Sequence, residues 1–299
     1  MPFVADAPVF EAPLTDPSAL AAVAADTLRY VREAGGKDPH APDAAVVDTL
    51  SLVVSAGDAL RDPAFLARCF SARRWIPDTR RWGGDLRLTR YLVYEVDGRT
   101  SPDAAHAHAL WASPADELRL RYTRQDVAAG VYREGGEAAG RATPLVWLAH
   151  HDHEQAILQG TTAVRLPDGV RLFNVDRDNG IPYDRTVTDT TKQRRYWYFR
   201  ETDAVRGWGV PGVPKIRLEP EVAVAGDLEN VGLGRLLALR TRDGLRLVVL
   251  ADTGGAFQPN LHQLDLYTGV FPSAKAFHAA TSAIGDTATA WVLERKEGC

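Results

Sequence analysis

The stretch VLADTGGAFQPNLHQLDLYTG, residues Val249–Gly269, decides how this chain is interpreted. An apolar run ends at Asp252, a Thr-Gly-Gly turn follows, and a second acid, Asp265, lies between two leucines. The pattern indicates a strand that delivers a carboxylate to a tight turn, because glycine adopts backbone conformations closed to other residues. The alternative is that Asp252 only caps a turn and Asp265 only solvates a strand edge. Taken alone, so short a motif favours that alternative.

The composition is that of a globular protein. The chain has 299 residues, of which 45% are hydrophobic and 25% charged, with a net charge of −4. It can therefore form one or two domains with a full core. Without a basic stripe, binding to nucleic acid is not expected. No apolar run approaches the roughly 20 residues of a membrane span, so we expect no transmembrane segment. The N-terminus shows no secretory signal.

Cysteine usage says little about the protein. Cys69 lies in the apolar context FLARCFS and is expected to be a buried core thiol, and Cys299 is the last residue. Two cysteines allow one disulfide, but nothing in the sequence brings them together.

The first 75 residues are predicted to form helical scaffold. Asp16 followed by Pro17 is a capping residue before a proline at the first helical position, and Gly35-Gly36 ends that helix. A second helix is predicted over 43–60, and a short third one after Pro63.

From about residue 86 the pattern changes to strands. LRLTRYLVYEV is rich in β-branched and aromatic residues. The most strand-like part of the middle third is PLVWLAHHDHEQAILQGTTAVRLPDGVRLFNVDRDNGIPYD. Pro167-Asp168-Gly169 predicts a hairpin, Thr123 begins a short helix, and a helix over 273–284 precedes a last strand, TATAWVLER. We therefore predict an α+β, mainly β fold with N-terminal helices, built around a barrel.

A series of motifs in this chain resembles one known family. In order these are LTRYLVYEV, LWASP, TRQDV, WLAHHDHEQAILQGTTAVRLPDG, DNGIPY, YWYFRE, GVPGVPKIRLEPEVAVAGDLENVGLG, ADTGGAF and LDLYTGVFPSAKAF. Together they are similar to the membrane-bound lytic murein transglycosylase A (MltA) family, whose C-terminal part is called the three-aspartate (3D) domain. The match covers the chain from about Leu86 to its end. The helical first 75 residues add little to it.

The resemblance implies a double-psi β-barrel made from both ends of the chain, a second β-rich domain inserted between those halves, and a groove between the two domains. In this sequence the N-terminal helices and the first part of the barrel would be residues 1–112. The inserted β domain would be 113–198, and the second part of the barrel, the three-aspartate domain, would be 199–299.

The resemblance also implies an activity. Proteins of this family are lyases that cleave the β-1,4 bond between N-acetylmuramic acid and N-acetylglucosamine in the peptidoglycan of the bacterial cell wall, and they form a 1,6-anhydromuramoyl end. They use no metal and no cofactor. The expected partner is a peptidoglycan glycan strand, and we expect a monomer. The expected location is the periplasm or cell envelope, reached with a signal that this sequence does not show.

The three aspartates of the family fall on Asp227, Asp252 and Asp265. Ordinary glycosidases use two carboxyl groups. In a lytic transglycosylase the muramic acid's own C6 hydroxyl attacks C1, so one carboxyl can donate a proton and then take one back. Its pKa must be raised by burial or by a nearby like charge. We expect Asp265 to be this acid and base, Asp252 to tune its pKa and position, and Asp227 to support them.

The substrate-binding residues that we expect come from four segments. A Q-G-S-G element, written here as Gln159-Gly160-Thr161-Thr162, and an N-G-x-x-Y turn match the family, although the second glycine of the first element is lost. The Asp252 turn and one tryptophan between glycines complete the set, which is Gln159, Gly160, Thr161, Asn179, Gly180, Tyr183, Trp208, Gly254 and Gly255.

Three alternatives stay open at this point. The run His150–Glu154 contains the usual zinc ligands, but in a strand only His151 and His153 would share a face, so no metal is the stronger interpretation. The chain could be a non-catalytic carbohydrate-binding protein on an expansin-like barrel. It could also be a hydrolase of a β-1,4-glycan, whose product would be heavier than the anhydro product by one water.

Overall fold

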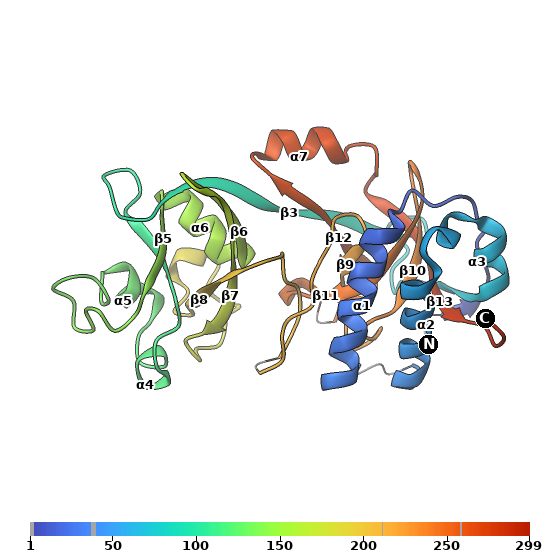
Figure 1. Ribbon diagram of the computed structural model, residues 1–299, viewed down its shortest axis with the longest axis horizontal. Helices are drawn as coiled ribbons and strands as arrows, with labels where there is room; N and C mark the ends of the chain where they lie inside the picture. The colour runs from blue at the N-terminus through green and yellow to red at the C-terminus, as the bar shows by residue number, and fades with distance from the viewer. Residues whose placement is uncertain (1–2, 37–39, 211, 258) are drawn as a thin grey trace. The chain divides into compact units, whose positions relative to one another are not determined.

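The chain forms two compact units (Figure 1). The computed structural model describes residues 3–36, 40–210, 212–257 and 259–299. The first unit comprises Met1–Leu92, Arg206–Gly269 and Ala274–Cys299, and the second comprises Val93–Val205 and Val270–Ser273. Both ends of the chain thus contribute to the first unit. The segment 113–198, predicted as an inserted domain, lies wholly inside the second.

The helices of the first unit follow the predicted signals. Asp16 accepts a hydrogen bond from the Ser18 N–H at 2.9 Å, and the first helix ends where Gly35 adopts a φ of 82°. Helix α1 (Pro17–Ala34) packs against helix α2 (Asp43–Ala56) (Figure 1). Helix α1 also contacts strand β11 (Gly244–Asp252), and α2 contacts strand β13 (Thr287–Arg295). The elements are α1 (Pro17–Ala34), α2 (Asp43–Ala56), η1 (Gly57–Arg61) and α3 (Pro63–Cys69).

The strands of the first unit follow one another in the order β13-β10-β11-β9-β12-β3, and β3 also pairs with β13, so this order closes on itself. Strand β9 runs parallel to β11 and antiparallel to β12. The elements are β1 (Phe3–Ala5), β2 (Phe70–Trp75), β3 (Leu86–Arg99), β9 (Ala223–Ala225), β10 (Leu236–Thr241), β11 (Gly244–Asp252), η3 (Gly255–Phe257), β12 (Gln263–Phe271), α7 (Ala274–Thr281) and β13 (Thr287–Arg295).

In the second unit, the end of β3 continues into the order β3-β6-β7-β8, and β5 pairs with both β3 and β4. The predicted hairpin is confirmed, since Leu166 pairs with Gly169 across the turn. The elements are β4 (His108–Trp111), α4 (Asp116–Arg119), α5 (Arg124–Ala128), β5 (Pro144–Leu148), α6 (His150–Gln159), β6 (Thr161–Leu166), β7 (Gly169–Asp178), η2 (Thr190–Lys192) and β8 (Trp197–Thr202).

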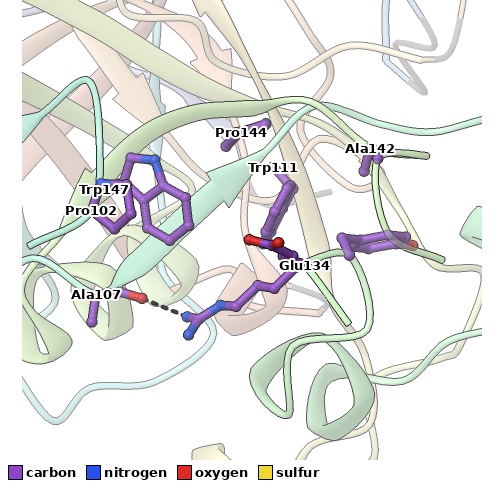
Figure 2. Close-up of a pocket in the computed structure, with 10 residues that line it drawn as sticks. Pro102, Ala107, Trp111, Glu134, Ala142, Pro144 and Trp147 are labelled. Atoms are coloured by element: carbon purple, nitrogen blue, oxygen red, sulfur yellow. Dashed lines mark hydrogen bonds between the residues drawn. The ribbon is translucent and has the colours of Figure 1, made fainter. Parts of the chain in front are cut away.

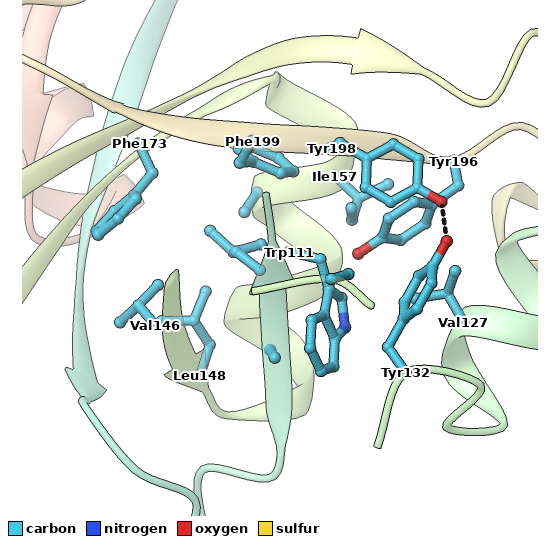
Figure 3. Packing of buried hydrophobic residues seen from close by; sticks show 14 of the residues in the cluster. Trp111, Val127, Tyr132, Val146, Leu148, Ile157, Phe173, Tyr196, Tyr198 and Phe199 are labelled. Atoms are coloured by element: carbon cyan, nitrogen blue, oxygen red, sulfur yellow. Dashed lines mark hydrogen bonds between the residues drawn. The ribbon is translucent and has the colours of Figure 1, made fainter. Parts of the chain in front are cut away.

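An aromatic core fills the second unit (Figure 3). Tyr196, Tyr198 and Phe199 of β8 and the segment before it are each no more than 1% exposed. The hydroxyls of Tyr132 and Tyr198 lie 2.7 Å apart and form a hydrogen bond inside this core. The core therefore ties the loop around Tyr132 to the sheet.

The mixed, sheet-dominated fold is confirmed, but one strand prediction was wrong. The segment His150–Gln159 forms helix α6, not a strand, and Gly160 ends it with a φ of 79°. Its residues HHDHEQAILQ contain no β-branched residue before Ile157, so the apolar strand pattern on either side of it did not extend through it. Among the described residues, no helix combines the length and apolarity needed to cross a bilayer.

The expectation that Cys69 is buried in the core is confirmed, since it is 3% exposed, but the expectation that it is a thiol was wrong. Cys69 forms a disulfide with Cys299, and their Cα atoms lie 5.5 Å apart. Strand β13 pairs with β2 so that Arg295 lies opposite Phe70, and this register returns the C-terminus to Cys69. The pairing joins positions separated by 230 residues, so no local sequence signal could reveal it.

Replacing both cysteines by serine is expected to destabilise the protein by about 2–4 kcal/mol, because the bond constrains a long loop in the unfolded chain. Urea unfolding of the oxidised protein and of the double variant measures this difference. Equal midpoints and slopes for the two proteins would contradict it.

Candidate active site

Strand β9 places two of the predicted aspartates in one row. Ala225 of β9 pairs with Asp252 of β11 on one side and with Asp265 of β12 on the other. Two inter-strand spacings, about 10 Å, therefore separate the Cα atoms of the two aspartates. The predicted pair is brought together by the sheet.

Tyr91 of β3 lies beside both carboxyl groups. Its hydroxyl donates a hydrogen bond to Asp252 Oδ2 at 3.0 Å, and its ring contacts that of Tyr267 with 5.3 Å between centroids. Burial raises the pKa of Tyr91 well above its usual value, and the charges of Asp252 and Asp265 raise it further. The phenol therefore remains a hydrogen-bond donor across the physiological pH range.

The Asp265 carboxyl is poised to hold a proton. Its Oδ1 atom is buried and has no hydrogen-bond partner within the part of the chain that the structure describes. Burial raises the pKa of Asp265 to about 6, against the opposing effects of the Thr89 hydroxyl and of the charges of Arg87 and Arg90. Because an unpaired buried carboxylate is costly, this side chain is suited to exchange a proton with a ligand.

Polar side chains order the region beside Asp265. Arg87 donates to Gln263 Oε1 at 3.3 Å, and Gln263 donates in turn to Thr89 Oγ1 at 3.0 Å. Arg90 forms an ion pair with Asp286 at 2.6 Å. The Arg90 charge is thus partly neutralised, which leaves burial as the larger effect on Asp265.

The Asp252 carboxyl is perturbed in the same direction. Burial raises its pKa to about 6, and the charge of Asp265 also raises it, whereas bonds from the Thr253 N–H and Tyr91 and the charge of Lys215 lower it. A Cβ atom on Gly207 would lie 3.1 Å from Asp252 Cγ, so only glycine fits beside this carboxyl without displacement.

Asp227 is buried and accepts hydrogen bonds from backbone N–H groups. Its side chain is fully buried, with 0% exposure, and it accepts hydrogen bonds from the N–H and the side-chain amide of Asn230 at 3.0 and 2.8 Å. It also accepts a bond from the Asn260 N–H at 2.9 Å. Asp227 thereby fastens the loop between Asp252 and Asp265, which makes it a positioning residue.

The predicted substrate residues of the second unit divide into exposed and structural ones. Gln159 is exposed at the end of α6, and Thr161 is buried and accepts a 2.6 Å bond from the Asn174 amide. Asn179 is 1% exposed and donates to the carbonyls of Tyr122 and Arg194 at 3.0 and 2.9 Å.

Gly180 and Tyr183 follow Asn179 at the surface. Gly180 adopts a φ of 72°, and a Cβ atom there would lie 2.5 Å from Leu120 Cδ2, so the turn requires glycine. Tyr183 is 51% exposed. Its ring is therefore available to a ligand, unlike the Asn179 amide.

The remaining predicted residues belong to the first unit, as do the three aspartates. Gly254 and Gly255 are exposed directly after Asp252. Trp208 is half-buried, and its ring contacts Tyr30 edge-on with 5.3 Å between centroids.

Three site residues escaped prediction: Thr89, Tyr91 and Gly207. The alternation along β3 contains the missing signal, since Arg87, Thr89 and Tyr91 are spaced two apart and so share one face of a strand. Gly207 carries no such signal, because its role depends on the distant Asp252.

The histidine-rich segment of α6 does not gather into a metal site. Within the described ranges, no group of three or more His, Cys, Asp or Glu side chains is placed to hold a metal ion.

Solved structures of lytic murein transglycosylases have the same fold as this chain. The membrane-bound enzyme from Agrobacterium tumefaciens matches with a TM-score of 0.69 at 18% identity, covering 94% of this chain and 93% of that one. Escherichia coli MltA with bound chitohexaose matches with 0.66 at 17%, covering 99% and 95%. Neisseria gonorrhoeae MltA matches with 0.64 at 15%, covering 95% and 88%.

The resemblance to the MltA fold is therefore confirmed by structure. No protein-family model and no curated protein matches the sequence.

Proposed function

We propose that this protein is a peptidoglycan lytic transglycosylase. It cleaves the β-1,4 bond between N-acetylmuramic acid and N-acetylglucosamine and leaves a 1,6-anhydromuramoyl end. The observation that carries the proposal is the Asp265 carboxyl in the fold of the MltA enzymes. Its buried Oδ1 has no hydrogen-bond partner among the residues that the structure describes, and its pKa is raised to about 6. As part of the same proposal, the closed order of strands in the first unit is a double-psi β-barrel.

A single carboxyl accounts for both proton transfers. Protonated Asp265 donates to the glycosidic oxygen as the bond from C1 to that oxygen breaks. The C6 hydroxyl of the muramic acid then forms a bond to C1 and gives its proton to the Asp265 carboxylate. The proton has moved from O6 to the leaving oxygen, Asp265 is restored, and no water is consumed.

Asp252 and Tyr91 support this cycle. Burial is the largest cause of the raised Asp265 pKa, and Asp265 in turn raises the pKa of Asp252. The charge of Asp265 therefore favours the protonated form of Asp252, in addition to the larger effect of burial. The Tyr91 hydroxyl holds Asp252 in place through its hydrogen bond. Asp265 keeps a buried oxygen that has no hydrogen-bond partner in the described part of the chain.

The glycan contacts in this proposal are those expected from the sequence. The exposed residues Gln159, Gly180, Tyr183, Gly254 and Gly255 contact the strand directly, whereas Thr161 and Asn179 shape the backbone beneath. The disulfide fits a periplasmic or envelope location, because such bonds persist in oxidising compartments.

Activity is expected to fall as the pH rises above about 6, because the catalytic cycle begins with protonated Asp265. On that limb, log(kcat/KM) should lose about one unit per pH unit. Initial rates of anhydro-product formation between about pH 4 and pH 9 measure this. A profile that stays flat from about pH 5 to pH 8 would contradict an acid with this pKa.

Digestion of purified peptidoglycan tests the proposal. The expected result is release of muropeptides with anhydro ends, identified by liquid chromatography and mass spectrometry. Binding to peptidoglycan without release would show a carbohydrate-binding protein instead. Products heavier by one water would show a hydrolase.

A further inference from the structure

A second candidate binding site lies in the second unit. A pocket of about 420 Å³ opens there between the β4–β5 pair and the loop around Tyr132 (Figure 2). Its volume is within the range of about 300–1,000 Å³ that is usual for small-molecule sites. It is lined by Pro102, Ala107, Trp111, Tyr132, Arg133, Glu134, Gly140, Ala142, Pro144 and Trp147. All of these belong to the second unit, whereas Asp265 belongs to the first.

The aromatic walls of the pocket are fixed by the core. The rings of Trp111 and Trp147 contact each other edge-on with 6.1 Å between centroids, and Trp111 also contacts Tyr132 at 5.5 Å. Tyr132 is held in turn by its hydrogen bond to Tyr198. The walls are therefore preformed and lose little entropy when a ligand binds.

Arg133 supplies a cation whose N–H groups are only partly paired with acceptors in the described part of the protein. Its guanidinium lies over the Trp147 ring, 5.6 Å from the centroid, and donates to the Ala107 carbonyl, shown by the dashed line in Figure 2. Its Nε is buried and has no hydrogen-bond partner among the described residues. Within the residues described, it forms no ion pair. An anionic group is the partner that such a guanidinium lacks.

The next residue, Glu134, gives the pocket its second charge. It is exposed and lines the pocket together with Trp111 (Figure 2). The pocket thus combines apolar walls with one cation and one anion. A sugar ring carries several hydroxyls that need hydrogen-bond partners. This mostly apolar lining, with Arg133 and Glu134 as its charged residues, matches a sugar ring poorly.

We propose that this pocket binds the peptide stem of peptidoglycan at a residue that carries both a free carboxylate and a free ammonium group. The carboxylate pairs with Arg133, the ammonium pairs with Glu134, and the aliphatic chain lies on Trp111 and Trp147. The proposal rests on the proposed function, because the stem belongs to the same polymer. It adds a site that recognises the peptide separately from the carboxyl that cleaves the glycan.

Calorimetric titration with the free stem tripeptide L-Ala-γ-D-Glu-meso-diaminopimelate tests the proposal. Wild type is expected to bind it, and Arg133→Gln should weaken binding at least about tenfold, because a charge-assisted pair at a partly buried guanidinium is lost. Glu134→Gln should weaken it about two- to fivefold, since that side chain is exposed. Arg141→Gln, an exposed arginine nearby that does not line the pocket, is the matched control and should bind as wild type does.

Two chemical controls need no variant. Acetylation of the free amine of the diaminopimelate residue or amidation of the carboxylates of the tripeptide should weaken binding to wild type, whereas acetylation of the L-Ala N-terminus alone should not. Excess chitohexaose should not compete. No tripeptide binding, unchanged affinity in Arg133→Gln, or complete displacement by chitohexaose would each overturn the proposal. These titrations do not depend on catalysis. A protein that binds the tripeptide but releases no anhydro product would therefore refute the proposed function alone.

Discussion

Asp265→Asn is expected to lower the rate of anhydro-product formation by about 10³-fold or more, because one carboxyl performs both proton transfers. An amide can neither protonate the leaving oxygen nor accept the proton of the C6 hydroxyl. Chromatography and mass spectrometry of peptidoglycan digests measure the rate. Asp58→Asn is the matched control, since the Asp58 side chain is 94% exposed, and it should leave the rate unchanged.

The same variant should remain folded. A carboxyl whose folded pKa is raised to about 6 binds more protons in the folded than in the unfolded protein between about pH 4 and pH 6. The free energy of unfolding therefore falls as the pH rises through that window, and ionised Asp265 destabilises the fold at neutral pH. We expect Asp265→Asn to have a Tm at pH 7 no lower than that of wild type. Loss of the fold, or retention of a tenth of the activity, would contradict the assignment.

Asp227→Ala is expected to destabilise the protein by about 4 kcal/mol, because the Asn230 and Asn260 N–H groups and the Asn230 amide lose their acceptor inside the protein. The loop between Asp252 and Asp265 would lose its anchor as well. Urea unfolding measures the cost, and product formation at a temperature where the variant is folded measures the effect on the site.

Asp227→Asn is the conservative control for that position. It keeps one side-chain oxygen as an acceptor and should recover part of the lost stability, whereas a direct role in proton transfer would leave it as inactive as Asp265→Asn. A cost below about 1 kcal/mol for Asp227→Ala would show that these hydrogen bonds do not anchor the loop.

Local signals predicted the elements whose causes are local. Asp16 and Pro17 begin α1 and Gly35 ends it, and each of these signals acts on the backbone next to it. The β6–β7 hairpin follows its own turn residues in the same way. Helix α6 was missed because apolar strands lie on both sides of it and its own residues carry a weaker signal.

The site was predictable only as far as it is continuous in sequence. Asp252 and Asp265 could be singled out from one stretch, and the sheet then brings them together on either side of Ala225. Tyr91 and Gly207 contact Asp252 from elsewhere in the chain, so only the fold reveals them. The disulfide depends in the same way on the register of β2 and β13.

Digestion of peptidoglycan in water enriched in ¹⁸O tests the central claim most directly. If the C6 hydroxyl attacks C1, the products are anhydro muropeptides that carry no ¹⁸O at their new ends. Products with one ¹⁸O at C1 would show attack by water and would contradict a lytic transglycosylase with Asp265 as its acid and base.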